Sequence, residues 1–230
     1  MVNVLLSNPE SLQVWIDFDG TISRKDVLDE LIRNFAINES WRLIEERWLA
    51  GLIGSRECLS QEFSLINISR EQLNSFLDQI ELDPGIGPLL ALLRQHGVPT
   101  AVLSDGIERF IRRILLRHGI TKLEIRANKV SHRAGRMTLS CPHASRECVS
   151  NAAHCKCASA DALRHPARRT VYIGDGRSDL CPARSADFVF AKGILANTLA
   201  HEHIPFIPYV TLHDVTAVLS RAWSAKVEAV

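Results

Sequence analysis

The sequence lacks any apolar run that approaches the length of a membrane-spanning helix. Met1 to Gln13 has no basic region followed by a long apolar stretch, so no secretory signal is expected. The chain also lacks an excess of charge. Its formal net charge of +1 gives no electrostatic reason to expect nucleic acid or an acidic membrane as a partner. With 46% hydrophobic and 23% charged residues, the composition predicts a soluble globular protein of the cytoplasm.

The cysteines do not form an evident disulfide framework. Two of the six stand apart, Cys58 and Cys181, and the others crowd one segment: Cys141, Cys148, Cys155 and Cys157. Disulfide frameworks are typical of small secreted domains, and 230 residues are enough for one sizeable core, or for a core with a smaller insert. We therefore expect reduced thiols.

The cysteine-rich segment also contains His143 and His154, so it has the residue types of a zinc site. Its spacings lack the paired Cys-x-x-Cys knuckle of common zinc modules. Two interpretations stay open here: a structural metal site, or a cysteine-rich loop that leads into Lys156.

The most informative stretch is Val14-Trp15-Ile16-Asp17-Phe18-Asp19-Gly20-Thr21. A short apolar run predicts a buried strand, and ligands of open α/β sheets bind at the carboxyl ends of such strands. Two carboxylates one residue apart repel each other unless a cation or a proton lies between them. The stretch therefore indicates metal-assisted chemistry.

The rest of the chain divides into two patterns. Residues from about 26 to 82 show helical periodicity in four successive segments, with no predicted strand, and Ser69 with Gln72 fits a capping box. From Ile86 onward, helices and strands alternate. Strands are predicted at 98–103, 123–125, 170–173 and 188–190, a hairpin at 130–139, and a closing helix at 212–223. This alternation predicts an α/β fold with a mostly parallel sheet and helices on both faces.

Polar residues follow three of the predicted strands: Asp17 and Asp19, then Ser104, then Asp175 and Asp179. The carboxyl ends of parallel strands meet at one edge of a sheet, so these side chains are expected to converge. Phosphoryl transfer needs a nucleophile, a proton donor, cationic charge and donors for the phosphate oxygens. The predicted cluster offers residue types for each of these tasks.

These motifs resemble those of the haloacid dehalogenase (HAD) superfamily of phosphatases, in the family's order and over residues 14 to 190. The resemblance implies a Rossmann-like three-layer core, with Asp17 as nucleophile and Asp19 as acid/base. It also implies that Ser104, Asp105, Gly106 and a lysine bind the phosphate. Mg²⁺ would be held by the acids of the first and fourth motifs: Asp17, Asp19, Asp175 and the supporting Asp179.

Two lysines compete for the lysine of the third motif. Lys156, in Cys155-Lys156-Cys157, lies between the second and fourth motifs, before a predicted helix. Lys129 is the alternative. We favour Lys156, because a lysine flanked by cysteines is rarely fully solvated.

The helical segment between the first two motifs resembles the type C1 cap of the phosphoserine phosphatase branch, subfamily IB. The resemblance implies a core of residues 1–25 and 83–230 and a cap of residues 26–82. Asp26 matches an acidic substrate-contact position, and Arg56 and Glu57 are further candidates. A solvated helix face is the alternative explanation for all three.

A closer similarity is to the branch that contains the enol-phosphate phosphatase of methionine salvage. It is carried by Ser104 to Glu108, Cys155-Lys156, Gly174 to Asp179, and Ala186 to Lys192. The resemblance implies Mg²⁺-dependent hydrolysis of a small phosphorylated metabolite, with phosphoserine as an alternative substrate. Two rivals from other classes are a non-catalytic protein that binds a phosphorylated metabolite and a metal-binding interaction module built on the cysteines. The sequence does not indicate the oligomeric state.

Overall fold

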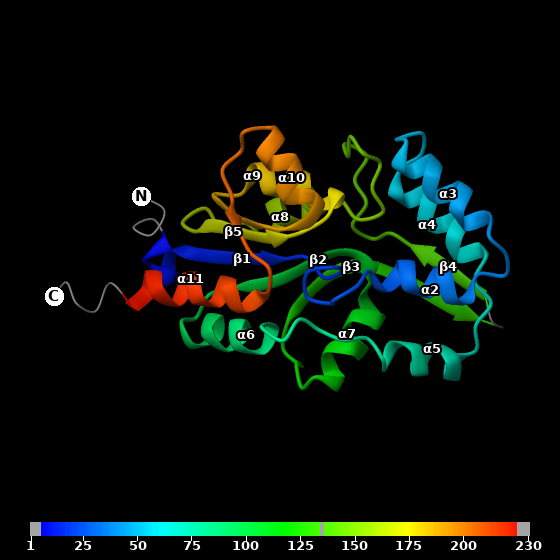
Figure 1. Ribbon diagram of the computed structural model, residues 1–230, viewed down its shortest axis with the longest axis horizontal. Helices are drawn as coiled ribbons and strands as arrows, with labels where there is room; N and C mark the ends of the chain where they lie inside the picture. Colours follow the sequence, from blue (N-terminus) through cyan, green and yellow to red (C-terminus); the bar gives the residue numbers. More distant parts are fainter. Residues whose placement is uncertain (1–5, 134–135, 225–230) are drawn as a thin grey trace.

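The structure is a computed structural model that describes residues 6–133 and 136–224. Over these residues, seven strands form one sheet in the order β4-β3-β2-β1-β5-β6-β7 (Figure 1). The strands are β1 (Leu12–Ile16), β2 (Thr100–Ile107), β3 (Glu124–Arg133), β4 (Arg136–Ser140), β5 (Arg169–Gly174), β6 (Phe188–Ala191) and β7 (Ile207–Pro208). All neighbouring strands are parallel except β3 and β4, which are antiparallel. The predicted α/β fold with a mostly parallel sheet is confirmed.

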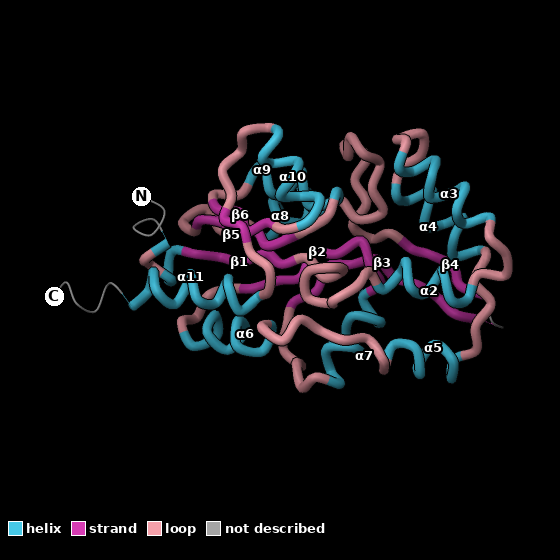
Figure 2. Tube along the Cα trace, in the orientation of Figure 1, coloured by secondary structure: helices cyan, strands magenta, loops and turns pink. Residues whose placement is uncertain are grey.

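Helices cover both faces of the sheet, which gives three layers (Figures 1 and 2). One face carries α6 (Ile86–Gln95), α7 (Glu108–Arg117) and α11 (Leu212–Ser224), and the other carries α8 (Lys156–Leu163), α9 (Leu180–Ser185) and α10 (Gly193–His201). Successive side chains of β1 point to opposite faces: Val14 and Ile16 join the core under the first set, and Trp15 joins the core under the second. Both faces of the strand are apolar because both are covered.

The segment between β1 and α6 is helical, as predicted. It contains α2 (Val27–Phe35), α3 (Ser40–Leu49), α4 (Ser55–Ser64) and α5 (Arg70–Leu77). The Asp26 carboxylate caps α2 by accepting from the amides of Leu28 and Asp29. The Ser69–Gln72 capping box of α5 is confirmed. In Figure 1, α3 and α4 lie at the end of the sheet beside β4.

The predicted hairpin at 130–139 is confirmed, because the second half of β3 pairs antiparallel with β4 and Val130 lies opposite Leu139. Two other predicted strands differ in length from the observed ones. The weak strand predicted at 123–125 is the start of β3, which continues to Arg133. Polar residues within it, such as Asn128, made it look interrupted, yet Asn128 is buried and bonded to the Asp105 carbonyl. The expected turn at Ala134-Gly135 lies outside the described residues. Strand β2 continues past Ser104 to Ile107, with a shift of register against β3.

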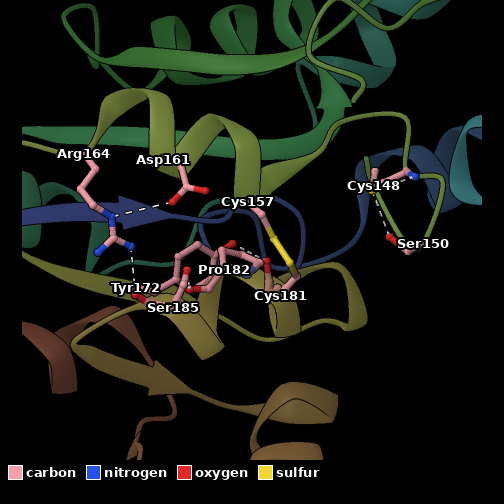
Figure 3. Close-up of a disulfide and its surroundings, with 11 residues drawn as sticks. Cys148, Ser150, Cys157, Asp161, Arg164, Tyr172, Cys181, Pro182 and Ser185 are labelled. Carbon is pink, nitrogen blue, oxygen red and sulfur yellow. Dashed lines mark hydrogen bonds and ion pairs between the residues drawn. A yellow bond between two sulfur atoms is a disulfide. The ribbon is translucent and has the colours of Figure 1, made fainter. Parts of the chain in front are cut away.

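The expectation of reduced thiols is wrong for one pair of cysteines. Cys157, in the first turn of α8, forms a disulfide with Cys181 in the first turn of α9 (Figure 3). Their Cα atoms are 6.0 Å apart, in the range that a disulfide spans. The other four cysteines are free. The pair was missed because Cys157 and Cys181 are distant in sequence, and only the packing of α8 against α9 brings them together.

Candidate active site

Three strands deliver polar residues to the same edge of the sheet. The register pairs Ile16 of β1 with Val102 of β2 and with Ile173 of β5. Asp17, Ser104 and Asp175 each follow shortly after these paired residues, so the backbone places them side by side. The predicted convergence of the strand ends is observed.

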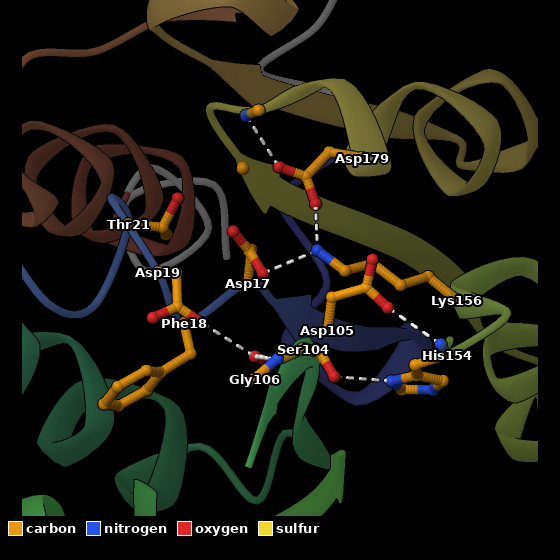
Figure 4. Close-up of polar contacts among 12 residues, drawn as sticks. Asp17, Phe18, Asp19, Thr21, Ser104, Asp105, Gly106, His154, Lys156 and Asp179 are labelled. Atoms are coloured by element: carbon orange, nitrogen blue, oxygen red, sulfur yellow. Dashed lines mark hydrogen bonds and ion pairs between the residues drawn. The ribbon is translucent and has the colours of Figure 1, made fainter. Parts of the chain in front are cut away.

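Lys156 lies at the centre of this edge (Figure 4). Its Nζ donates to Asp17 Oδ1 at 2.6 Å and to Asp179 Oδ1 at 2.7 Å. All three side chains are buried. Burial alone would lower the pKa of Lys156, but the charges of Asp17 and Asp179 raise it overall, so the amine stays protonated. The lysine therefore bridges two carboxylates as a fixed cation.

Asp179 holds the lysine in place, and each of its carboxylate oxygens accepts two hydrogen bonds. Besides Lys156, its Oδ1 accepts from the Tyr172 hydroxyl at 2.6 Å. Its Oδ2 accepts from the amides of Asp175 at 3.0 Å and Gly176 at 2.9 Å. Four donors thus fix Asp179, and Asp179 in turn fixes the position of the Lys156 amine.

Asp19 lies on the other side of Asp17, between the core and α2. Its Oδ2 accepts from Ser104 Oγ at 3.1 Å, and its Oδ1 accepts from the Val27 amide at 2.9 Å. Burial, followed by the charge of Asp26, raises the pKa of Asp19 to about 8. At neutral pH this carboxyl group carries a proton that it can donate.

Two glycines let the backbone approach these carboxylates closely. Gly20 has a φ of +77°, and a Cβ there would overlap the Asp175 carboxylate. A Cβ on Gly106 would lie 2.7 Å from Asp19 Oδ2 and 2.8 Å from Ser104 Oγ. The Gly106 amide donates to Ser104 Oγ at 2.8 Å, so the last residues of β2 present hydroxyl and amide groups together. Such an arrangement suits the binding of phosphate oxygens.

Asp105 connects the core to the helical segment. Its carboxylate accepts from Ser55 Oγ of α4 at 3.2 Å and from the His154 amide at 2.8 Å. The His154 ring is buried between the Ser104 carbonyl at 2.7 Å and Ser159 Oγ at 2.6 Å. Since a carbonyl only accepts, Nδ1 of His154 carries the proton and Nε2 accepts from the hydroxyl. Burial lowers the pKa of His154 to about 3, so the ring is neutral.

Within the described residues, the side chains placed to hold a metal ion are those of Asp17, Asp175 and Asp179, whose ligand atoms lie within 4.8 Å of one another. The Thr21 hydroxyl orients Asp175 by donating to its Oδ1 at 2.6 Å. Burial and the neighbouring carboxylates raise the pKa values of Asp17 and Asp175. With Asp19, four acidic side chains thus lie near Lys156, and an oxygen-rich site of this kind fits Mg²⁺. No cysteine or histidine of the 141–157 segment belongs to this group.

A cleft of about 580 Å³ opens in front of these residues. Its floor includes Asp17, Asp19, Lys156 and Asp175, and its opposite wall comes from α2, α3 and α4. Asp26 lines the cleft. Arg56 and Glu57 do not appear among the described residues that line it, and Glu57 pairs with Arg47 at 3.6 Å.

The structure brings together most of the residues that the sequence suggested: Asp17, Asp19, Ser104, Lys156, Asp175 and Asp179. Lys129 instead lies on the surface, 4.0 Å from Glu108. Sequence reasoning missed Tyr172 and His154. A tyrosine in an otherwise apolar buried strand needs a partner for its hydroxyl, and that signal would have pointed to Tyr172.

Comparisons with known proteins agree with this geometry. The model of the family described as haloacid dehalogenase-like hydrolase matches residues 14–184. A 2-hydroxy-3-keto-5-methylthiopentenyl-1-phosphate phosphatase of Brevibacillus brevis is 28% identical over 92% of this chain and 96% of its own length. The phosphatase of the same name from Bacillus thuringiensis subsp. konkukian is 29% identical over 94% of this chain and 99% of its own length.

A solved structure supports the fold independently. A substrate-bound phosphoserine phosphatase complex superposes with a TM-score of 0.67, covering 89% of this chain and 96% of that chain. Its sequence is 20% identical, so the likeness concerns the fold. Among the described residues, no helix combines the length and apolar character that a membrane crossing requires.

Proposed function

Because this chain belongs to the haloacid dehalogenase-like hydrolase family, we propose that its phosphatase activity proceeds through an aspartyl-phosphate on Asp17. The observation that carries the proposal is the placement of Lys156, whose amine is held between Asp17 and Asp179 at 2.6 and 2.7 Å. Lys156 is a fixed cation beside the Asp17 carboxylate, and the protonated Asp19 lies on the other side of Asp17. Together they offer positive charge for the phosphate and a proton for the leaving group.

In the first step, an Asp17 oxygen attacks phosphorus and the bond to the leaving alcohol oxygen breaks. Asp19 gives its proton to that oxygen, which the raised pKa of about 8 permits at neutral pH. In the second step, Asp19 takes a proton from water as the water attacks phosphorus. The bond to Asp17 breaks, and inorganic phosphate and free Asp17 result. Ser104 and Lys156 bind the phosphoryl oxygens throughout, and the Gly106 amide holds the Ser104 hydroxyl in place.

The site would hold Mg²⁺ through the Asp17 and Asp175 carboxylates and the Asp19 backbone carbonyl, with Asp179 in support. When bound, Mg²⁺ supplies positive charge that offsets the phosphate and the carboxylates. We expect residues 26–82 to form a cap domain on a core of residues 1–25 and 83–230. Such a cap would exclude water from the cleft between them.

The names of the relatives make the enol phosphate of methionine salvage the first candidate substrate. Phosphoserine is the second candidate. We still predict that the protein is located in the cytoplasm. The reducing conditions there would reduce the Cys157–Cys181 disulfide.

The function is tested with a generic aryl phosphate and purified protein. Hydrolysis should require Mg²⁺ and should fall to the background rate in Asp17→Asn. Asp161→Asn, which removes an exposed carboxylate that pairs with Arg164, is the matched control and should stay active. Undiminished hydrolysis by Asp17→Asn, or in the presence of a chelator, would contradict the mechanism.

A further inference from the structure

The loop between β4 and α8, residues 141–155, takes no part in the chemical steps proposed above. Hydrogen bonds within the loop fix its path. The Cys155 amide donates to the His143 carbonyl at 3.0 Å, and the Asn151 amide donates to the Cys148 carbonyl at 3.0 Å. A loop that is ordered in this way offers a fixed surface to another part of the chain.

The N-terminus of α4 packs against this loop so closely that there is no space for a side chain (Figure 1). Gly54 is the N-cap residue of α4, and a Cβ on it would overlap the Asn151 carbonyl oxygen and lie 2.9 Å from the carbonyl oxygen of Ser150. The φ of Gly54 is −83°, which any residue can adopt. The contact with the loop, and not the backbone conformation, therefore requires glycine at this position.

Ser55, the first residue of α4, links the same contact to the catalytic residues. Its Oγ donates to Asp105 Oδ2 at 3.2 Å and accepts from the Ala153 amide at 2.9 Å. Ala153 is buried, and the other oxygen of Asp105 accepts from the His154 amide at 2.8 Å (Figure 4). One hydroxyl group of the helical segment thus contacts both the loop and the end of β2.

The helical segment has a second connection to the core, through the two linkers by which the chain enters and leaves it. There the Arg24 amide donates to the Glu81 carbonyl at 3.0 Å, and the Asp83 amide donates to the Ile22 carbonyl at 2.8 Å. These linkers join the segment to the core covalently, whereas the contact at Ser55 is made by hydrogen bonds and packing alone. The contact at Ser55 is therefore the one that can form and break as the segment moves about its linkers.

We propose that Ser55 is a positioning residue, which aligns the helical segment over the catalytic residues by docking on residues 150–154. The loop is the docking surface, and it continues directly into Lys156, the first residue of α8. The docked segment and the catalytic lysine thus share one support. The inference rests on the proposed phosphatase function and deepens it, because the alignment matters only for a substrate whose phosphate lies at Asp17.

The kinetic test uses Gly54→Ala, which displaces α4 from the loop, and Ser55→Ala, which removes two hydrogen bonds. In each variant, kcat/KM for a generic aryl phosphate should fall at least about fivefold, the effect of losing two hydrogen bonds. Inorganic phosphate contacts only the core, so its inhibition constant should stay within about twofold of wild type. Ser55→Thr keeps the hydroxyl group and should restore most of the activity.

Two variants serve as matched controls. Ser60→Ala removes a hydroxyl group that bonds within α4, to the Arg56 carbonyl, and Gly87→Ala adds a Cβ in open space on α6. Both should keep the kcat/KM of the wild type. A contact that only stabilises the fold would lower Tm in the Gly54 and Ser55 variants and leave their kcat/KM unchanged, and that result would overturn the proposal.

Hydrogen exchange followed by NMR separates this inference from the catalytic one, because it needs no activity. In Gly54→Ala, the Ala153 amide should exchange at least about tenfold faster, since the displaced helix takes the Ser55 hydroxyl away from it. The Cys155 amide, which is bonded within the loop, should keep its rate. If these exchange rates are found in a protein that hydrolyses no phosphate ester, the proposed function fails and the docking contact stands. If the Ala153 amide exchanges as in the wild type, the docking contact fails whatever the activity.

Discussion

Reduction of the Cys157–Cys181 disulfide should lower the thermal stability of this protein by a measurable amount. The bond joins α8, which begins at Lys156, to α9, which begins directly after Asp179. For a sequence separation of 24 residues, the loss of loop entropy in the unfolded chain corresponds to about 3.5 kcal/mol. With an unfolding entropy of about 2.1 cal/mol/K for each of the 230 residues, Tm should fall by about 7 °C.

The catalytic lysine should keep its position after reduction, because its amine is held by two carboxylates and not by the disulfide. We therefore expect kcat/KM at room temperature to stay within about twofold of the oxidised protein while Tm falls. Differential scanning calorimetry with and without a thiol reductant, and phosphatase assays on the same samples, measure both quantities.

Two variants make the result specific. In Cys157→Ser/Cys181→Ser, Tm should already be low and the reductant should lower it no further. In Cys148→Ser, which changes a free cysteine, the reductant should lower Tm as in the wild type. A wild-type Tm that the reductant leaves unchanged, or a full shift that persists in the double variant, would refute the reasoning.

Three further predictions concern the site and its support. Lys156→Met leaves the two buried carboxylates that it bridges without a cation, so denaturant unfolding should show a loss of about 3–5 kcal/mol, and a loss below about 1 kcal/mol would count against the bridge. The pKa of His154 is lowered from 6.5 to about 3, so its stabilisation is complete above pH 6.5 and decreases as pH falls toward 3. Between about pH 7 and pH 5.5 the wild type should lose about 1.3 kcal/mol more than His154→Gln in urea unfolding, and an equal loss would exclude a neutral buried ring. Gly20→Ala, whose Cβ would overlap the Asp175 carboxylate, should lower kcat at least about tenfold, whereas Gly119→Ala, with similar φ and open space around it, should affect only stability.

Much of the fold follows from local patterns in the sequence. Short apolar runs predicted β1, β5 and β6, because these strands are buried on both faces and have no polar side to obscure them. The helices α9 and α10 and the short β7 were not predicted. In α10 the chain combines Gly193, at a φ of +57°, with Asn197 and Thr198, which are poor helix formers, so its helicity depends on the packing of Leu195 and Leu199 against the sheet.

The catalytic residues were the most predictable part of the site, and the reason is topological. Asp17, Asp19 and Asp175 follow strand ends, and Ser104 lies within β2 near its end. Parallel strand ends meet at one edge whatever lies between them in the chain. Lys156, the first residue of α8, was favoured instead from its place between two motifs and its cysteine neighbours. The supporting residues have no such rule. Tyr172 bonds to Asp179, which follows β5 in the chain, and His154 bonds to Ser104 of β2 and Ser159 of α8. These contacts depend on how the segments after β5 and before α8 fold.

Glu62 shows where the sequence pattern fails most clearly. Glu62 sits in α4, a helix of low amphipathic contrast, and a glutamate at its position looks like one more solvated side chain. Glu62 is buried and its neighbour Glu57 is exposed, and only the folded structure distinguishes the two. The predicted catalytic residues therefore lie mostly near strand ends, where sequence reasoning works, while the burial of helical side chains such as Glu62 depends on packing that the sequence pattern does not show.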